Sequence, residues 1–295
     1  MKGTTAKAVI CAALGNILWG FSFLFTKVGL AIAPNPNVML AHRFTLSALL
    51  MTIPILLGKE KISFKGKNWR PIVVLLLMQS LYFLFETYGV LYTNATIAGL
   101  VLAVVPVVTI GTGALFLKEY PTRRQALFCI MPVAGVIIMT ISGKELGVVT
   151  LLGIVCLLLT MLVSAVFKTA NRKAAEEFTS YERTFLVLVN SAVVFTIVGM
   201  GSVEWNVQNF VAPLLDIKYL LCMGSLGMLC SIAANLLVNF AAGHMSVFKL
   251  SSFGSLSTLC TMVTGVLFLK EPISVSLVLG ALLIIVGIRQ VTKPK

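Results

Sequence analysis

The stretch Thr112-Gly-Ala-Leu-Phe-Leu-Lys-Glu119 decides the fold, because the chain repeats it. Seven of its eight residues recur in Thr264-Gly-Val-Leu-Phe-Leu-Lys-Glu271, at an offset of 264 − 112 = 152. Each copy closes an apolar run and is followed by a second run, and Gly135 and Gly287 keep the same offset. A fixed internal offset is typical of a duplicated unit. The sequence therefore predicts two related halves.

The composition places both halves in a membrane. Hydrophobic residues make up 58% of the chain and charged residues 11%, and the mean hydropathy is +1.00, whereas soluble proteins carry about 25% charged residues. The net charge is +13, but Lys and Arg lie in short loops between apolar runs, which disfavours nucleic-acid binding. The six cysteines lie inside apolar runs without a Cys-x-x-Cys pair. They therefore predict neither a disulfide framework nor a zinc site.

Apolar runs long enough to cross a bilayer, about 20 residues, occur ten times. They cover approximately 8–30, 37–57, 71–92, 96–117, 123–141, 148–169, 181–201, 217–241, 245–269 and 273–291. Five spans per half is an odd number, so the second half must cross in the opposite direction, which makes an inverted repeat. We therefore predict an all-α membrane protein with ten transmembrane helices. Its two inverted five-helix repeats, 1–144 and 145–295, surround a central cavity.

Lys and Arg in the loops predict the orientation, because cytoplasmic loops are enriched in both. With the N-terminus inside, one side receives 17 of these residues and the other side three. The inner set is Lys2, Lys7, Lys59, Lys61, Lys65, Lys67, Arg70, Lys118, Arg123, Arg124, Lys168, Arg172, Lys173, Arg183, Arg289, Lys293 and Lys295. The outer set is Lys144, Lys218 and Lys270. We therefore expect a multi-pass protein of the cytoplasmic membrane with both termini in the cytoplasm.

Ionisable residues inside the predicted spans are functional candidates, because a charge in mid-membrane costs about 2.5–3.5 kcal/mol even on insertion scales. They are Lys27, Arg43, Glu86 and Lys249. Arg43 and Glu86 lie at similar depth in the outer half, so we expect them to face each other, either as a structural pair or with substrate between them. Glu86 is also the candidate proton carrier if transport is proton-coupled. For Lys27 and Lys249, near span ends, snorkelling to the surface is the alternative.

Polar residues at helical spacing extend these faces. The predicted substrate-binding residues are Trp19, Arg43, Gln79, Tyr82, Glu86, Asn235, Asn239, Lys249 and Ser252. The alternative is that such stripes join helices to one another through hydrogen bonds. Pro106 lies in the middle of its span and predicts a kink that frees a backbone carbonyl. Thr258 occupies the corresponding position of the second half, so we expect this break in the first half alone.

These features together resemble the EamA-type transporters of the drug/metabolite transporter superfamily, over essentially the whole chain. The motifs are Leu18-Trp-Gly20 with Lys27, His42-Arg43-Phe44, Glu86 through Tyr92-Thr-Asn94 to Pro106, Lys249-Leu-Ser251, and the two Phe-Leu-Lys-Glu ends. Thr258 departs from the Pro often present in the second repeat of that family. The resemblance implies a cavity between the two halves, alternating access, and export or exchange of amino acids, other metabolites or drugs.

We therefore expect a secondary transporter and not an enzyme. The expected partners are a small-molecule substrate such as an amino acid, the lipid bilayer, and protons or a counter-substrate for coupling. No cofactor and no nucleic acid are expected, and the working state is a monomer or a weak homodimer. The alternatives are a channel, a non-transporting receptor or scaffold, and an intramembrane enzyme using Ser255 with His42 or His244. The sequence has no phosphate loop for an ATP-driven pump.

Overall fold

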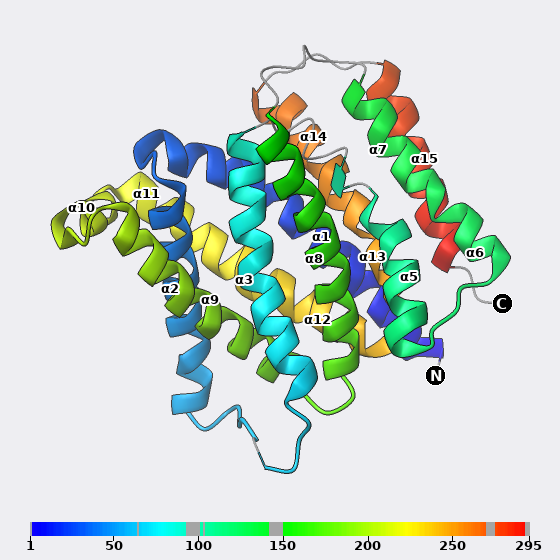
Figure 1. Ribbon diagram of the computed structural model, residues 1–295, viewed down its shortest axis with the longest axis horizontal. Coiled ribbons are helices and arrows are strands. Elements are labelled where there is room, and N and C mark those ends of the chain that lie inside the picture. Colours follow the sequence, from blue (N-terminus) through cyan, green and yellow to red (C-terminus); the bar gives the residue numbers. More distant parts are fainter. Residues whose placement is uncertain are drawn as a thin grey trace.

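A computed structural model describes residues 2–63, 65–92, 101–102, 104–141, 150–269 and 275–292. Throughout these ranges the regular structure is helical, without a strand (Figure 1). The helices of the first half are α1 Lys2–Ile32, α2 Pro36–Leu56, α3 Arg70–Leu91, α5 Val105–Leu117, α6 Arg123–Phe128 and α7 Ile130–Ile141. Those of the second half are α8 Leu151–Ala174, α9 Ser180–Ser202, α10 Val207–Val211, η1 Ala212–Leu215, α11 Ile217–Ser225, η2 Leu226–Ala233, α12 Ala234–His244, α13 Val247–Ser252, α14 Gly254–Leu269 and α15 Val275–Thr292.

Six helical segments of the described residues are long and apolar enough to cross a membrane. They are Ala6–Ile32, Pro36–Leu56, Arg70–Gly89, Leu151–Ala174, Ser180–Ser202 and Ile217–His244. Each coincides with one of the ten predicted spans. The sequence chemistry explains where they begin: α2 starts at Pro36 behind the cap residue Asn35, and Thr179 with Glu182 forms a capping box at the start of α9.

The other four predicted spans contain helices that are short or interrupted. Among the described residues, Val105–Leu117 and Val278–Val291 are apolar helical stretches below the length of a full span; residues 96–100, 103, 273 and 274 of these two predicted spans lie outside the described part. The predicted span 123–141 is divided at Cys129 into α6 and α7, and the predicted span 245–269 is divided at Phe253 into α13 and α14. Hydropathy does not register such interruptions, because the residues on both sides remain apolar.

The interruption at Phe253 corrects the expectation that only the first half is broken in its fourth span. Pro106 does lie at an interruption, since Val104 forms a turn and α5 begins at Val105; proline has no N–H to donate to the preceding turn and is tolerated in the first turn of a helix. The second half breaks without a proline. Here Ser252 donates its hydroxyl to the carbonyl of Phe248 and Gly254 follows the break. A serine bonded back to its own helix and a glycine both weaken helical continuity.

The equivalent glycines Gly135 and Gly287 lie at the contact between α7 and α15. A Cβ atom on Gly135 would meet the carbonyl oxygen of Gly280 at 2.6 Å and Ile284 Cγ1 at 2.9 Å. A Cβ atom on Gly287 would meet Pro132 Cγ at 2.8 Å. Ascending numbers on α15 therefore meet descending numbers on α7, so the two helices pack antiparallel and with their backbones close together.

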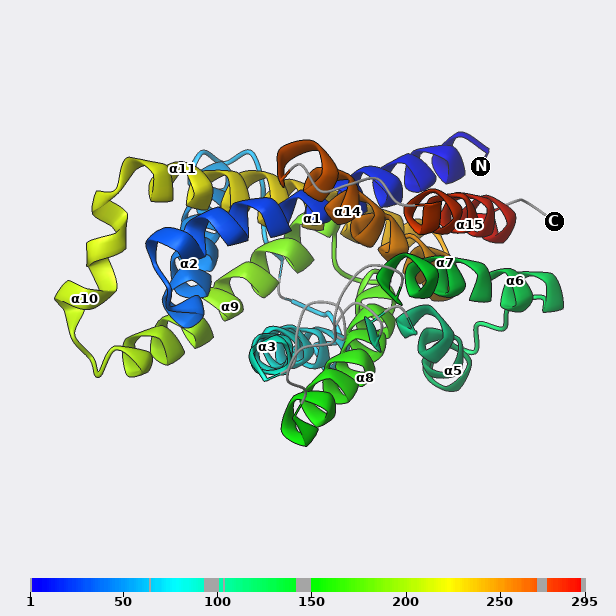
Figure 2. The ribbon, with the colours of Figure 1, turned by 90° about the horizontal axis from the view of Figure 1, so that it is seen from above.

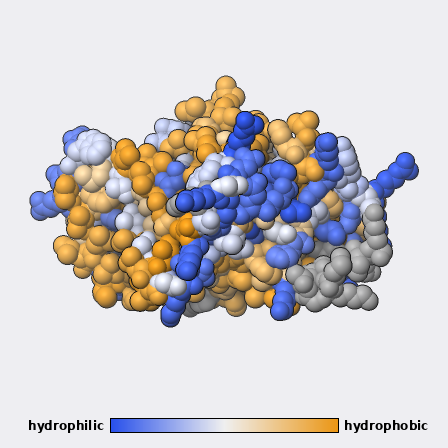
Figure 3. All heavy atoms as spheres, turned by 90° about the horizontal axis from the view of Figure 1, so that it is seen from below, coloured by the Kyte–Doolittle hydropathy of each residue, from blue (hydrophilic) through white to orange (hydrophobic). Residues whose placement is uncertain are grey.

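The long helices pack mainly across the two halves. α3 lies along α8, α2 along α9, and α1 along α12 and α14, as the two ribbon views show (Figures 1 and 2). The start of α1 and the end of α15 lie on the same side of the molecule (Figure 1). The lower end of the bundle carries the loop between α2 and α3, where Lys59, Lys61 and Lys65 are exposed. Hydrophilic side chains gather across the middle of this face (Figure 3). We call this lower end of the bundle, with the loop between α2 and α3, the basic end.

Candidate functional site

Five polar residues lie near one another on the side of the bundle away from the basic end, and we call them the Arg43 cluster. Its members are Arg43, Tyr82, Glu86, Ser231 and Asn235. Tyr82 donates its hydroxyl to Glu86 Oε1 at 2.8 Å, Arg43 Nε donates to Ser231 Oγ at 2.8 Å, and Asn235 Nδ2 donates to the Ser231 carbonyl at 2.6 Å. Hydrogen bonds thus join α2 to the segment η2–α12, whereas the Tyr82–Glu86 pair lies within α3.

The charges of Arg43 and Glu86 interact through space. Among the ion pairs of the described residues, none joins these two groups. Arg43 is buried, with 7% of its surface exposed, and Glu86 is half-buried. The two opposite charges thus belong to different helices, and they are near each other without forming a direct ion pair. This arrangement brings together four of the predicted site residues: Arg43, Tyr82, Glu86 and Asn235.

Aromatic rings hold the Arg43 side chain in place. Its guanidinium carbon lies 5.4 Å from the ring centre of Phe44 and 5.8 Å from that of Phe83. The two rings contact each other edge to face at 5.1 Å, and Phe195 of α9 stacks on Phe44. Cation–π contacts of this kind stabilise a desolvated guanidinium by up to about 2 kcal/mol. They explain how α2 keeps a charge inside the bundle.

Trp19 joins the same region through η2, which is a π-helix. Its indole Nε1 donates to the carbonyl of Cys230 at 3.0 Å. Ser47 Oγ also reaches a carbonyl of this segment, that of Gly227, at 3.4 Å. π-Helical turns are rare and occur often at functional sites. No periodicity in the sequence predicted this segment, because its residues are apolar or small like those of the α-helical turns around it.

Asn239, another predicted site residue, lies in a different group that we call the Arg183 network. Asn171 Nδ2 donates to Asn239 Oδ1 at 2.7 Å, and Asn239 Nδ2 donates to Thr184 Oγ1 at 2.8 Å. Arg183 donates to the carbonyls of Asn171 at 3.0 Å and Asn239 at 2.6 Å. Both ends of the Asn239 amide are thus occupied by neighbouring helices.

Arg183 corrects the sequence analysis, which counted it among the exposed loop charges. Only 2% of its surface is exposed, because it enters the bundle at the start of α9 and its partners come from α8 and α12. Asn171 and Asn239 lie 12 and 56 residues from Arg183 in the sequence. No local sequence pattern therefore indicates that Arg183 contacts them. The network lies toward the basic end, since the neighbouring Glu182 forms an ion pair with Lys67 of the α2–α3 loop at 2.7 Å.

Lys168 was also counted as a loop residue, and the structure places it within α8. Its Nζ donates to Ser251 Oγ at 3.2 Å, beside the interruption between α13 and α14. Lys249 is half-buried on α13. Ser252 is fully buried and its hydroxyl lies 3.5 Å from the Cys129 thiol, so it faces α6 and α7 and not the Arg43 cluster.

The remaining candidates are placed as follows. Gln79 is buried on α3, two turns before Glu86. Pro106 is buried at the start of α5, where its carbonyl accepts the hydroxyl of Thr109 at 2.8 Å. The side chain of Lys27 lies outside the described part. Within that part, no three His, Cys, Asp or Glu side chains gather as a metal site.

Comparisons with known proteins agree on one family. The model of the EamA-like transporter family matches residues 6–141 and again 151–292. The uncharacterized transporter YcxC of Bacillus subtilis is 33% identical over 292 residues, which cover 98% of this chain and 93% of that protein. The uncharacterized transporter YvbV of the same organism is 26% identical over 286 residues, 96% of this chain and 90% of that protein.

The fold also recurs in solved structures. One protein known from a crystal structure superposes with a TM-score of 0.78 at 17% sequence identity, over 97% of this chain and 96% of that chain. At this identity the likeness concerns the fold alone.

Proposed function

Because the chain belongs to the EamA-like transporter family of the drug/metabolite transporter superfamily, we propose that it is a secondary carrier for a small zwitterionic metabolite, such as an amino acid. The carrier exports or exchanges this substrate across the cytoplasmic membrane by alternating access. Its ten spans form two inverted repeats, residues 1–144 and 145–295, with both termini in the cytoplasm. The family and its relatives point to a transporter and not to an enzyme.

The pattern of neighbouring helices supports the inverted repeat. In the two repeats, α1 corresponds to α8, α3 to α11–α12, and α5 to α14. When the halves are exchanged by this correspondence, the contact between α3 and α8 becomes the contact between α12 and α1. The contact between α5 and α8 likewise becomes the contact between α14 and α1. All four contacts occur. The contacts of α2 with α9 and of α7 with α15 exchange into themselves, as expected for helices beside a two-fold axis.

The glycine contact between α7 and α15 supports the opposite direction of the two copies. Gly135 meets Ile284, and Gly287 meets Pro132. The repeat offset of 152 makes Ile284 equivalent to position 132 and Gly287 equivalent to position 135, since 284 − 152 = 132 and 287 − 152 = 135. The two contacts are therefore the same contact, made once by each copy of the repeat. Equivalent helices that pack antiparallel in this way are related by an axis in the membrane plane, the symmetry of inverted-repeat transporters.

The observation that carries the substrate proposal is that Arg43 and Glu86 bring opposite charges near each other without a direct ion pair. A zwitterion presents a carboxylate and an ammonium group a few ångströms apart. Arg43 suits the carboxylate because its planar guanidinium binds carboxylates through two parallel hydrogen bonds, and Glu86 suits the ammonium group. Tyr82, Ser231 and Asn235 supply neutral hydrogen-bonding groups around them.

Alternating access requires that the opposite end be closed while this site is reached from outside. The Arg183 network supports that arrangement, because it joins α8, α9 and α12 on the basic side of the Arg43 cluster. Opening of the site toward the cytoplasm would require these hydrogen bonds to break. Lys168 lies on the same side, at the break between α13 and α14.

Reconstitution into liposomes tests the proposal. Purified protein is screened with a panel of amino acids, amines and carboxylates for saturable uptake and for counterflow from preloaded vesicles. Glu86→Gln and Arg43→Gln should each lower transport of zwitterions about tenfold or more, since a charge-assisted hydrogen bond contributes about 1.5–3 kcal/mol. Glu176→Gln, which changes an exposed carboxylate of a surface pair, is the matched control and should retain transport.

Three outcomes would overturn the assignment. Full zwitterion transport in both Glu86→Gln and Arg43→Gln would remove the substrate role of the cluster. Flux without saturation or counterflow would instead indicate a channel, and absence of flux with every compound would favour a receptor or scaffold.

A further inference from the structure

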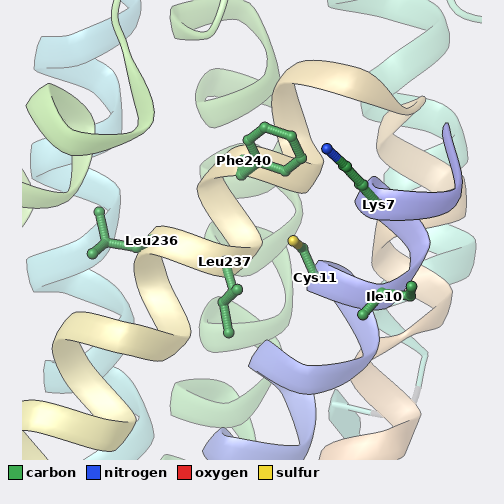
Figure 4. A pocket seen from close by; sticks show the side chains of 6 residues that line it. All are labelled: Lys7, Ile10, Cys11, Leu236, Leu237 and Phe240. Carbon is green, nitrogen blue, oxygen red and sulfur yellow. The ribbon is translucent and has the colours of Figure 1, made fainter. Parts of the chain in front are cut away.

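A groove runs along one flank of the contact between α1 and α12, and none of the residues of the Arg43 cluster lines it. It is an open, shallow groove with a volume of about 300 Å³, lined by Lys7, Ile10, Cys11, Leu236, Leu237 and Phe240 (Figure 4). Five of these six residues carry no charge, and the ammonium group of Lys7 lies at one end of the groove.

Small residues in the adjoining helix contact explain why the groove exists. α1 presents Ala8, Ala12 and Gly15 to α12, where Val238 and Ala241 meet them in the core. The approach is close, since a Cβ atom on Gly15 would lie 2.7 Å from Val238 Cγ2. When two backbones approach this closely, the larger side chains beside the contact must lean apart. The space between them is the groove, and it opens toward the surface of the bundle, where 57% of Ile10 is exposed.

The position of the charge indicates the kind of ligand. Lys7 is exposed in the first turns of α1, and His244, also exposed, lies at the end of α12 with its ring stacked on Phe240 at 4.3 Å. Both helix ends point toward the basic end of the bundle. The groove is therefore apolar along the membrane depth and basic where the helices leave it. A soluble ligand would find no polar partner along its walls.

We propose that this groove binds an anionic phospholipid of the cytoplasmic leaflet, with one acyl chain along Ile10 and Leu237 and the phosphate on Lys7. Basic pockets between spans on the cytoplasmic side bind lipid headgroups by this chemistry. An acyl chain matches the apolar walls. The charge complementarity of Lys7 selects an anionic headgroup over a neutral one.

Lipid binding to the purified full-length protein tests the proposal. Native mass spectrometry in detergent measures the affinities for phosphatidylglycerol and for phosphatidylcholine with the same acyl chains. The wild-type protein should prefer phosphatidylglycerol. Lys7→Gln should lower that preference about fivefold, since one basic residue near a lipid surface contributes about 1 kcal/mol. Lys59→Gln, which removes an exposed charge of the same end outside the groove, is the matched control and should leave it unchanged.

A second variant tests the acyl-chain part. Ile10→Trp fills the groove from its exposed rim and should weaken both lipids, whereas Ile10→Val should weaken neither. Thermal melting of each variant checks that it is folded. Equal affinity of the wild-type protein for the two lipids, or an equal loss in Lys7→Gln and Lys59→Gln, would overturn the proposal. So would unchanged lipid binding in a folded Ile10→Trp protein, which would place the lipid elsewhere on the bundle.

Discussion

Arg43 and Arg183 are both buried, with exposed fractions of 7% and 2%, and they differ in what surrounds the guanidinium. Arg43 bonds one serine hydroxyl, lies against two aromatic rings and has Glu86 nearby. Arg183 is bound by carbonyl and amide oxygens of two other helices. Under the proposed function, the first arrangement leaves the guanidinium able to bind the carboxylate of a substrate. In the second arrangement, the hydrogen bonds of Arg183 are made to neighbouring helices and hold them together.

Arg183 should therefore matter for stability. Arg183→Met removes three buried hydrogen bonds from a charged donor, to the carbonyls of Asn171 and Asn239 and to Asn171 Oδ1, and hydrogen bonds to a charged group contribute about 1.5–3 kcal/mol each. We expect a loss of about 3 kcal/mol or more in the free energy of unfolding, measured by denaturant titration in micelles. Arg172→Met removes a half-exposed ion pair with Glu119 and should cost about 1 kcal/mol or less. Similar losses in both variants would contradict the structural role of the network.

Trp19 offers a second test at the residue scale. Trp19→Phe keeps an aromatic ring on α1 but removes the donor to the Cys230 carbonyl. The expected loss is about 1 kcal/mol of unfolding free energy, seen as a lower melting temperature in detergent. Trp205→Phe, a change at an exposed residue of the loop before α10, should leave the melting temperature unchanged. A melting temperature of Trp19→Phe equal to that of the wild-type protein would show that η2 does not depend on this bond.

At the scale of the elements, the sequence predicted where helices lie better than how they are interrupted. Apolar runs end at charged residues, prolines and glycines, so the ends of α2, α3 and α9 fall within a few residues of the predicted spans. The π-helical segment and the break at Phe253 were not predicted. Both depend on which backbone donors and acceptors pair, and the residues around them are as apolar as an uninterrupted span.

The candidate site was predicted in part for a similar reason. Glu86 and Tyr82 share a face of one helix, so their spacing in sequence places them together. Arg43 and Ser231 lie on different halves, and only the packing of α2 against η2 brings them into contact. Lys168 and Arg183 were assigned to loops because basic residues near span ends usually reach water. Their polar partners from other helices, Ser251 in one case and Asn239 in the other, were not visible in sequence.

Glycine substitutions test the contact between α7 and α15. A Cβ atom at Gly135 meets the backbone oxygen of Gly280 at 2.6 Å, which cannot move without shifting α15. Gly135→Ala should therefore destabilise the protein by about 1–3 kcal/mol. Gly111→Ala lies in α5 with no heavy atom within 4 Å of its Cβ and should be neutral or stabilising by up to about 1 kcal/mol. The comparison is made by thermal unfolding, and an equal effect of the two changes would contradict the close packing.

At the scale of the whole molecule, the basic end predicts which side faces the cytoplasm. Gln208 lies on α10, which follows α9, and Lys61 lies in the loop between α2 and α3; both are exposed. A membrane-impermeant maleimide should label Gln208→Cys in intact cells. It should label Lys61→Cys only after the cells are made permeable. The parent protein gives the background from the native cysteines. Labelling of Lys61→Cys in intact cells would reverse the proposed orientation.

The π-helical segment has a consequence for how the two ends of the molecule are linked. Cys230 and Ser231, which accept Trp19 and Arg43, lie within it, and Asn239 of the Arg183 network lies beyond it. If the segment returned to α-helical hydrogen bonding by one residue, everything beyond it would turn by about 100° and advance by about 1.5 Å relative to everything before it. One helix could not then satisfy both groups at once. A change of hydrogen-bonding register in η2 would thus allow the helix to bind the Arg43 cluster or the Arg183 network, but not both at the same time.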